Sequence, residues 1–207
     1  GLHTGVDANM TFCPAPLNHG IKFQRTDLPD QPVVDADVDH VVDLSRGTTI
    51  EYNGARINTV EHTMAATVGM EIDNLLIQLD GPEPPIIDGS SGKFVQALQS
   101  AGLMEQNALR NFFEVNESIF YRDHSRDVEI AALPLDDYRV TVMIDYKSPV
   151  LGSQHASITD ISQFPREIAQ SRTFCFLHEL EMLYKNGLIK GGDLNNAIVV
   201  VDKVIEE

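Results

Sequence analysis

The chain has 207 residues, 43% of them hydrophobic, and a formal net charge of −16. This composition is ordinary for a water-soluble protein with a sizeable core, and the acidic balance argues against nucleic acids and anionic membrane surfaces as partners, since both need a basic footprint. The sequence has no apolar run long enough for a membrane span and no signal segment at its start, so we expect neither membrane insertion nor secretion.

The two cysteines indicate a reducing compartment. Cys13 and Cys175 lie far apart in the sequence and outside any CxxC or CxxH spacing. Cysteines of this kind are typical of reduced core thiols, so we expect a cytoplasmic protein.

The first half of the chain is predicted to form strands followed by helices. It opens with a hairpin turn over residues 1–5 that no strand precedes, so we expect the first strand of the fold to be missing from this chain. Asn53-Gly54 between two apolar runs is a strong hairpin signal, and Gly102 is a typical helix stop. The expected elements are strands over 8–12, 21–25, 38–44 and 74–79, a hairpin over 48–57, and helices over 58–70 and 93–100.

The helix predicted over 58–70 carries two adjacent ionisable residues, Glu61 and His62, in its first turn. Asn58 or Thr59 is its expected N-cap. Neighbouring positions on a helix are about 100° apart, so both ionisable side chains can border one cavity. Three apolar residues at helical spacing form the expected core stripe of this helix: Val60, Met64 and Val68.

The Glu61–His62 pair supports two interpretations. The helix dipole favours Glu in a first turn, and a single His is most often a satisfied polar residue. Alternatively, the imidazole holds a metal and the carboxylate handles a proton. Because a zinc site needs three or four ligands, the pair alone does not decide between them. Asp88 and Ser90, at the entrance of the helix over 93–100, are likewise either N-capping residues or ligand contacts.

The second half repeats the order of strands and then helices. Residues 103–110 are the expected linker, which divides the chain into a first domain over 1–104 and a second, C-terminally incomplete domain over 105–207. The sequence therefore predicts an α+β fold of two similar two-layer sandwich domains, each a mainly antiparallel sheet packed with helices, with an active-site cleft between them. The expected elements are strands over 112–120, 128–132, 138–146, 173–176 and 197–201, and helices over 161–171 and 178–185.

Six motifs, taken together, resemble the zinc-dependent UDP-3-O-acyl-N-acetylglucosamine deacetylases of lipid A biosynthesis. The resemblance covers essentially the whole chain, and several motifs in one order are far more specific than any one of them. The motifs are GLHTG at 1–5, RTDL at 25–28, TVEH at 59–62, PIIDGSSGKFV at 85–95, SRTFCF at 171–176 and GGDLNNAIVV at 191–200.

The resemblance implies a zinc-dependent amidase. Its reaction would be hydrolysis of the N-acetyl group of the small molecule UDP-3-O-(3-hydroxyacyl)-N-acetylglucosamine, with release of acetate, the committed step of lipid A biosynthesis. His62 would be a Zn²⁺ ligand and Glu61 the general base, because zinc lowers the pKa of its bound water to about 7 and a neighbouring carboxylate can take the proton. Thr173 would donate a hydrogen bond to the tetrahedral oxyanion.

The resemblance also implies a set of substrate contacts. Without it, the same residues are typical of core, turn and solvated surface positions. The implied contacts are Leu2 and His3 near the substrate, Phe174, Phe176, Leu180, Ile189 and Gly192 along an apolar passage for the acyl chain, Tyr146 and Asp145 at the uridine, and Arg126 at the diphosphate.

Further zinc ligands of the family lie in an HKxxxD motif, and its catalytic His lies in a GH motif, both after the last strand of this chain. We therefore expect the remaining Zn²⁺ ligands beyond residue 207 and an inactive fragment that binds zinc weakly by itself. Two alternatives remain open. One is a metal-free module that binds nucleotide sugars, and the other is the deacetylase half of a fusion with a 3-hydroxyacyl-carrier-protein dehydratase.

Overall fold

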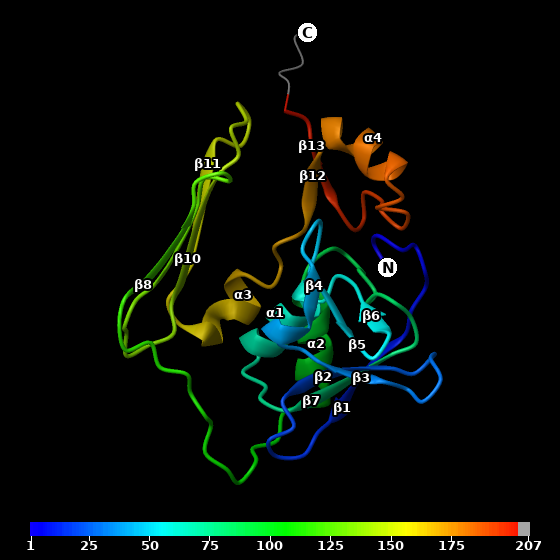
Figure 1. Ribbon diagram of the computed structural model, residues 1–207, viewed down its shortest axis with the longest axis vertical. Helices are drawn as coiled ribbons and strands as arrows, with labels where there is room; N and C mark the ends of the chain where they lie inside the picture. Colours follow the sequence, from blue (N-terminus) through cyan, green and yellow to red (C-terminus); the bar gives the residue numbers. More distant parts are fainter. Residues whose placement is uncertain (203–207) are drawn as a thin grey trace.

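The computed structural model describes residues 1–202, which mix helices and strands as expected for an α+β protein (Figure 1). Over these residues, no helix has the length and apolar character of a membrane span. In chain order, the elements are β1 (Met10–Pro14), β2 (Ile21–Arg25), β3 (Val33–Asp35), the 3-10 turn η1 (Val38–His40), β4 (Val41–Asp43), β5 (Thr49–Tyr52), β6 (Ala55–Ile57), α1 (Glu61–Gly69), β7 (Leu75–Leu79), α2 (Gly92–Ala101), β8 (Ile119–Asp123), β9 (Val128–Ala132), β10 (Val140–Asp145), β11 (Ser153–Ile158), the 3-10 turn η2 (Ile161–Gln163), α3 (Phe164–Glu167), β12 (Phe174–Phe176), α4 (Leu177–Lys185) and β13 (Ile198–Val200).

One hydrophobic core joins two sheets of the first half to α1 and α2. The larger sheet has the order β1-β7-β2-β3, in which β7 is antiparallel to β1 and parallel to β2. The smaller sheet has the antiparallel order β4-β5-β6. Leu75, Ile77 and Leu79 of β7 are buried at alternate positions, because successive side chains of a strand point to opposite faces.

The hairpin predicted over 48–57 is confirmed as β5 and β6. Tyr52 pairs with Ala55 at its end. Asn53 and Gly54 both have positive φ, 48° and 77°, which is the conformation that a tight two-residue hairpin turn requires. The hairpin ends directly before the segment that leads into α1.

The start of α1 differs from the prediction. The helix is capped by Val60, whose side chain makes no capping hydrogen bond. The two expected caps bind a different segment, since Asn58 Nδ2 donates to the Pro82 carbonyl and Thr59 Oγ1 donates to the Glu83 carboxylate. The prediction was wrong because these polar side chains have tertiary partners that local sequence does not show.

The buried face of α1 matches the predicted stripe only at Val60, which is 2% exposed. Met64 is only half-buried and Val68 is 46% exposed. The fully buried positions are Thr63, Ala66 and Thr67, and the Thr67 hydroxyl donates to the Thr63 carbonyl at 2.9 Å. Small residues form this face because α1 lies close to its neighbours in the core, and threonine satisfies its hydroxyl within the helix.

The second half contains the antiparallel hairpins β8–β9 and β10–β11 and a parallel pair, β12–β13, connected by α4. Figure 1 shows both hairpins at the left, apart from the sheets of the first half. Over residues 1–202, the two hairpins are not hydrogen-bonded into one sheet. The α+β class is thus confirmed, whereas two sandwich domains with a cleft between them stay a prediction.

The helix predicted over 161–171 is shorter than expected. It is the 3-10 turn η2 followed by α3, which ends at Glu167. Pro165 is tolerated because it lies in the first turn of α3, where its missing N–H has no intrahelical partner. The Ala169 N–H then bonds to the Phe164 carbonyl at 2.9 Å, a wider turn that closes the helix.

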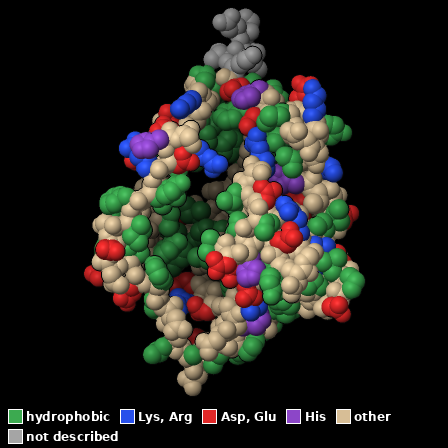
Figure 2. All heavy atoms as spheres, in the orientation of Figure 1, with side chains coloured by type: hydrophobic (Ala, Val, Ile, Leu, Met, Phe, Trp, Pro, Cys, Tyr) green, Lys and Arg blue, Asp and Glu red, His purple; other side chains and the backbone are tan. Residues whose placement is uncertain are grey.

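An apolar hollow of about 270 Å³ lies between the β10–β11 hairpin and the helices α1 and α3. Val68, Val142 and Phe164 are among the residues that line it. Figure 2 shows hydrophobic side chains gathered around a hollow between the hairpins and the rest of the molecule. In β10, Val142 is 48% exposed and Met143 is 78% exposed, so both faces of this hairpin present apolar side chains to solvent.

Replacing Gly69 by Ala should destabilise the fold. A Cβ at Gly69 would collide with the buried ring of Phe164, so α3 must shift away from α1. Overpacking of this kind costs about 1–3 kcal/mol, measured as a lower urea midpoint of unfolding. The double variant Gly69→Ala/Phe164→Val should lose less than the sum of the single variants, because the smaller side chain makes room. Additive losses would contradict the contact.

Candidate active site

Glu61 and His62 form the first turn of α1, and both are half-buried. The Glu61 Oε2 atom accepts a hydrogen bond from the Thr48 N–H at 2.8 Å, which fixes the carboxylate. Burial lowers the pKa of His62, while the negative charges of Glu61 and Asp88 oppose this shift. The imidazole is therefore held towards its neutral form, in which a ring nitrogen can bind a metal or accept a proton.

The loop over 85–91 lies against this pair. The Asp88 Oδ1 atom accepts from the Ser90 N–H at 3.1 Å and from the Ser90 hydroxyl at 2.8 Å. Ser90 in turn accepts from the Gly92 N–H at the start of α2, at 3.1 Å. The predicted N-capping was wrong, because the N-cap of α2 is Ser91, which makes no side-chain capping bond. Asp88 instead contributes negative charge at His62.

Thr173 is brought to the same loop by backbone hydrogen bonds. Its N–H donates to the Gly89 carbonyl at 2.8 Å, and Arg172 Nε donates to the Asp88 carbonyl at 2.7 Å. Gly89 has φ 80°, and a Cβ there would collide with the Asn196 carbonyl, so only glycine fits this close approach. The structure thus joins three segments that are far apart in the sequence: the start of α1, the 85–91 loop and the 171–176 segment.

Glu83 connects the turn over 1–5 to the start of α1. Its side chain is 0% exposed and accepts from the His3 N–H at 3.0 Å, the Thr4 N–H at 2.8 Å and the Thr4 hydroxyl at 2.7 Å. The Thr59 hydroxyl donates to Glu83 Oε1 at 2.8 Å, the oxygen that the His3 N–H also contacts, whereas Thr4 donates to Oε2. Burial by itself raises the pKa of Glu83, but these hydrogen bonds outweigh it and hold the pKa below its usual range.

Thr59 is strained. Its φ is 56°, in the left-handed region, where a β-branched residue costs on the order of 1–3 kcal/mol. The hydrogen bond to Glu83 holds it there. Strain of this kind persists only where the surrounding structure determines the conformation, and such positions cluster at functional sites.

Four of the predicted substrate contacts lie together at the turn over 1–5. Leu2 is buried, and its carbonyl accepts from the Gly191 N–H at 3.1 Å. Its side chain lies against Gly192, whose own N–H donates to the Ile189 carbonyl at 3.0 Å. The His3 Nδ1 atom is buried without a hydrogen-bond partner among the described residues.

An aromatic cluster unites three more predicted contacts. The ring of Tyr146 lies edge-on to those of Phe174 and Phe176, with centroids 5.4 Å and 6.4 Å away. The structure therefore places the aromatic residue expected at the uridine beside two residues expected along the acyl passage. Leu180 is half-buried in α4, directly after this cluster, and Asp145 is exposed beside Tyr146.

Arg126 lies apart from these groups. It occupies the exposed turn of the β8–β9 hairpin, where its guanidinium is 3.7 Å from the Asp123 carboxylate. Over residues 1–202, no hydrogen bond or ion pair joins Arg126 to another predicted site residue.

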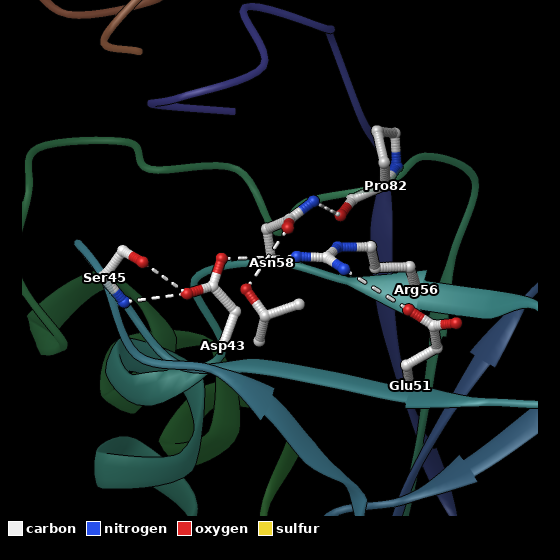
Figure 3. A network of polar contacts seen from close by, with 7 residues as sticks. Asp43, Ser45, Glu51, Arg56, Asn58 and Pro82 are labelled. Atoms are coloured by element: carbon white, nitrogen blue, oxygen red, sulfur yellow. Dashed lines mark hydrogen bonds and ion pairs between the residues drawn. The ribbon is translucent and has the colours of Figure 1, made fainter. Parts of the chain in front are cut away.

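A polar network fixes the loop that borders Glu61. Arg56 donates to Asp43 at 3.3 Å and to Glu51 at 3.4 Å, and Ser45 donates to Asp43 (Figure 3). The loop then passes Glu61 so closely that a Cβ at Gly47 would lie 3.1 Å from its Oε1 atom. A pocket of about 270 Å³ adjoins this network.

Arg46 spans the two halves of the chain. Its Nη2 atom lies 3.2 Å from the Glu179 carboxylate, and Glu179 also accepts from the Phe176 N–H at 3.1 Å. The loop before α1 is thus tied to the start of α4, which follows the aromatic cluster.

The residues present fit one position of a zinc site. His62 supplies a partly buried imidazole with its pKa lowered, and the Glu61 carboxylate is its neighbour. Over residues 1–202, no three His, Cys, Asp or Glu side chains cluster closely enough to hold a metal ion. A zinc ion on His62 would therefore need ligands from outside the described residues, as the sequence predicted.

Two important residues of the site were missed by sequence reasoning. Glu83 stands between prolines in a loop, and no local pattern shows that its carboxylate is fully buried. Arg172 was noted only as part of a motif, although it bonds to the carbonyls of Asp88 and Asn195. Both roles depend on contacts between distant segments.

Comparisons with known proteins find relatives that match nearly the whole chain. The family model for LpxC, UDP-3-O-acyl N-acetylglycosamine deacetylase, matches residues 1–207. A protein of Chlorobaculum tepidum named bifunctional enzyme LpxC/FabZ is 50% identical over 100% of this chain and 44% of its own length. UDP-3-O-acyl-N-acetylglucosamine deacetylases of Myxococcus xanthus and Methylococcus capsulatus are 42% and 44% identical over 97% of this chain, covering 63% and 66% of their lengths. The chain thus spans about half the length of the bifunctional relative.

Replacing Glu83 by Gln should destabilise the protein most near neutral pH. Gln keeps the size of the side chain but loses its charge and one acceptor, so buried donors lose their partner, at a cost of roughly 3 kcal/mol. The folded pKa of Glu83 lies below its ordinary value of 4.5, so the stabilisation is present above that value and is lost as the pH falls through the folded pKa. Urea unfolding at a series of pH values measures the gap between wild type and variant.

The matched control is Glu117→Gln, an exposed position, which should unfold like wild type at every pH. A gap for Glu83→Gln that stays constant as the solution is acidified would contradict an ionised carboxylate at Glu83.

Proposed function

The chain belongs to the UDP-3-O-acyl-N-acetylglucosamine deacetylase family, and we propose that the protein carrying it removes the acetyl group from the sugar nitrogen of a UDP-3-O-acyl-N-acetylglucosamine in lipid A biosynthesis. The observation that carries this proposal is the Glu61–His62 pair, a fixed carboxylate beside a half-buried imidazole, at the start of α1. The pair lies against the 85–91 loop, which binds Thr173.

Zinc, when bound through His62, would act as a Lewis acid that lowers the pKa of water at the site. The Thr48 N–H holds the Glu61 carboxylate, which supports Glu61 as the base that would take a proton from the attacking water. The negative charge of Asp88 favours a cation at His62. The departing sugar amine would gain a proton from Glu61 or from the catalytic His expected beyond residue 207.

Thr173 supplies the third role, a hydrogen bond to the amide oxygen as negative charge develops on it. Its support is the backbone bond to Gly89, which places the residue beside the loop that carries Asp88. A rigid donor is effective because it needs no reorganisation during the reaction.

The substrate is a small molecule with an apolar and a charged end. Leu2 and Ile189, which both lie beside Gly192, would line the acyl passage together with Gly192 and the cluster of Phe174 and Phe176. Tyr146 and Asp145 would meet the uridine, and Arg126 the diphosphate. A location in the cytoplasm belongs to the same proposal, supported by the two free thiols.

The proposed architecture is two facing sandwich domains, over residues 1–104 and 105–207, with the site in the cleft between them. Its support is the apolar hollow beside β10, whose exposed hydrophobic side chains suit a further packed layer. The deacetylase of Myxococcus xanthus has more than a third of its length outside the match to this chain. We expect the remaining zinc ligands and the covering layer in a corresponding segment of this protein.

A second candidate is the deacetylase half of a fusion with a dehydratase. Relatives from Chlorobaculum tepidum and Bacteroides thetaiotaomicron, 50% and 45% identical over the whole chain, are both named bifunctional enzymes. This arrangement leaves the roles of Glu61 and His62 unchanged. A metal-free module that only binds the nucleotide sugar is the remaining alternative.

Replacing Glu61 by Gln in the complete protein should leave the zinc content unchanged and lower kcat for deacetylation by about 10²–10⁴-fold, because Gln cannot accept the proton. The measurements are acetate release and metal content by elemental analysis. Glu117→Gln is the control and should match wild type. Full activity of the Glu61 variant would refute its role as base, and absence of activity in wild type would favour the binding module.

The 207-residue chain alone should bind zinc only weakly, since one imidazole is too few for a tight site. Isothermal titration calorimetry with zinc measures this directly. Tight binding of one zinc ion per chain would contradict the proposal that further ligands lie outside these residues.

A further inference from the structure

Glu83 is a fully buried acid to which the proposed chemistry gives no role. Its carboxylate accepts hydrogen bonds from the backbone of His3 and Thr4 and from the hydroxyls of Thr4 and Thr59. These donors come from two segments far apart in the sequence, the turn over 1–5 and the residues before α1. Among the described residues, no Lys, Arg or His forms an ion pair with Glu83. Neutral donors alone balance its charge.

The segment before α1 is anchored to Pro82 and Glu83 by three hydrogen bonds. The N–H and Nδ2 of Asn58 donate to the Pro82 carbonyl at 2.9 Å and 3.0 Å, and the Thr59 hydroxyl donates to Glu83 at 2.8 Å. Because α1 has no side-chain cap and Thr59 is held at a φ of 56°, this anchor determines where the helix begins. It therefore sets the direction of the Glu61–His62 turn, two residues further on.

The turn over 1–5 is held by the same carboxylate. The N–H groups of His3 and Thr4 both point at it, and a Cβ at Gly1 would collide with it. On its other side, the turn bonds to the segment over 189–192 through its backbone. The two oxygens of Glu83 thus hold the turn that carries His3 against the segment that leads into α1.

We propose that Glu83 is a positioning residue for the deacetylation, which fixes the turn over 1–5 relative to the first turn of α1 so that His3 and the Glu61–His62 pair form one rigid wall. The kinetic test of this inference rests on the proposed function, because it measures the rate of deacetylation. Stability alone does not require a buried carboxylate, because apolar residues of similar volume often serve a core equally well or better. A reacting group misplaced by about 1 Å lowers the rate by about 10²-fold, so a rigid anchor serves the reaction.

Hydrogen exchange of the complete protein, without substrate, tests the anchor. Thr59→Val removes the hydroxyl and keeps the shape, whereas Thr59→Ser keeps the hydroxyl. Thr59→Val and Glu83→Gln should both increase exchange in peptides over 1–8 and 58–64, while Thr59→Ser and Glu117→Gln should match wild type. Unchanged exchange over 58–64 in Glu83→Gln and Thr59→Val would overturn the proposal. If Glu83→Gln fails to fold, the comparison of Thr59→Val with Thr59→Ser still tests the anchor.

Steady-state kinetics on folded, metal-loaded enzyme separate positioning from a purely structural role. Thr59→Val and Glu83→Gln should lower kcat by about 10–100-fold with little change in KM, and Thr59→Ser should restore most of the rate. A loss of unfolding free energy with an unchanged kcat would overturn the proposal. Absence of deacetylation in wild type would refute the proposed function instead, and the exchange experiment, which needs no substrate, would still test the anchor.

Discussion

The buried carboxylate of Glu83 is the constraint on which the arrangement of the site depends. Four hydrogen bonds from neutral donors keep it ionised inside the protein, and those donors belong to two distant segments. An unpaired buried charge is costly, so neither segment can move away without leaving the carboxylate unsatisfied. The strained backbone of Thr59 is held by this interaction, and α1 begins directly after it.

A second junction connects the start of α1 to the second half of the chain. The 85–91 loop contributes the charge of Asp88 at His62, and its backbone binds Arg172 and Thr173 of the second half. The ion pair of Arg46 with Glu179 also ties the loop before α1 to α4. The groups proposed for catalysis therefore come from separate parts of the chain and are held by backbone and buried polar contacts, which is the rigidity that a preorganised site requires.

Local chemistry made part of the structure predictable. The Asn53-Gly54 turn requires positive φ at both positions, so it specified its hairpin correctly. The apolar spacing from Val60 correctly predicted that Glu61 lies in the first turn of a helix. Contacts between segments far apart in the chain could not be predicted from local sequence. The burial of Glu83 and the tertiary partners of Thr59 depend on segments more than twenty residues away, and β11 was missed because its alternating side chains are polar and exposed.

The central claim is that the wall formed by His3, Glu61 and His62 belongs to a zinc amidase that acts on a UDP-linked acyl glucosamine. Acetate release by the complete protein tests this claim most directly. The account predicts that purified protein converts UDP-3-O-acyl-N-acetylglucosamine to equal amounts of acetate and free amine. It also predicts that a chelator abolishes the reaction and that added zinc restores it. Substrate that binds but stays acetylated after zinc is restored would contradict the account.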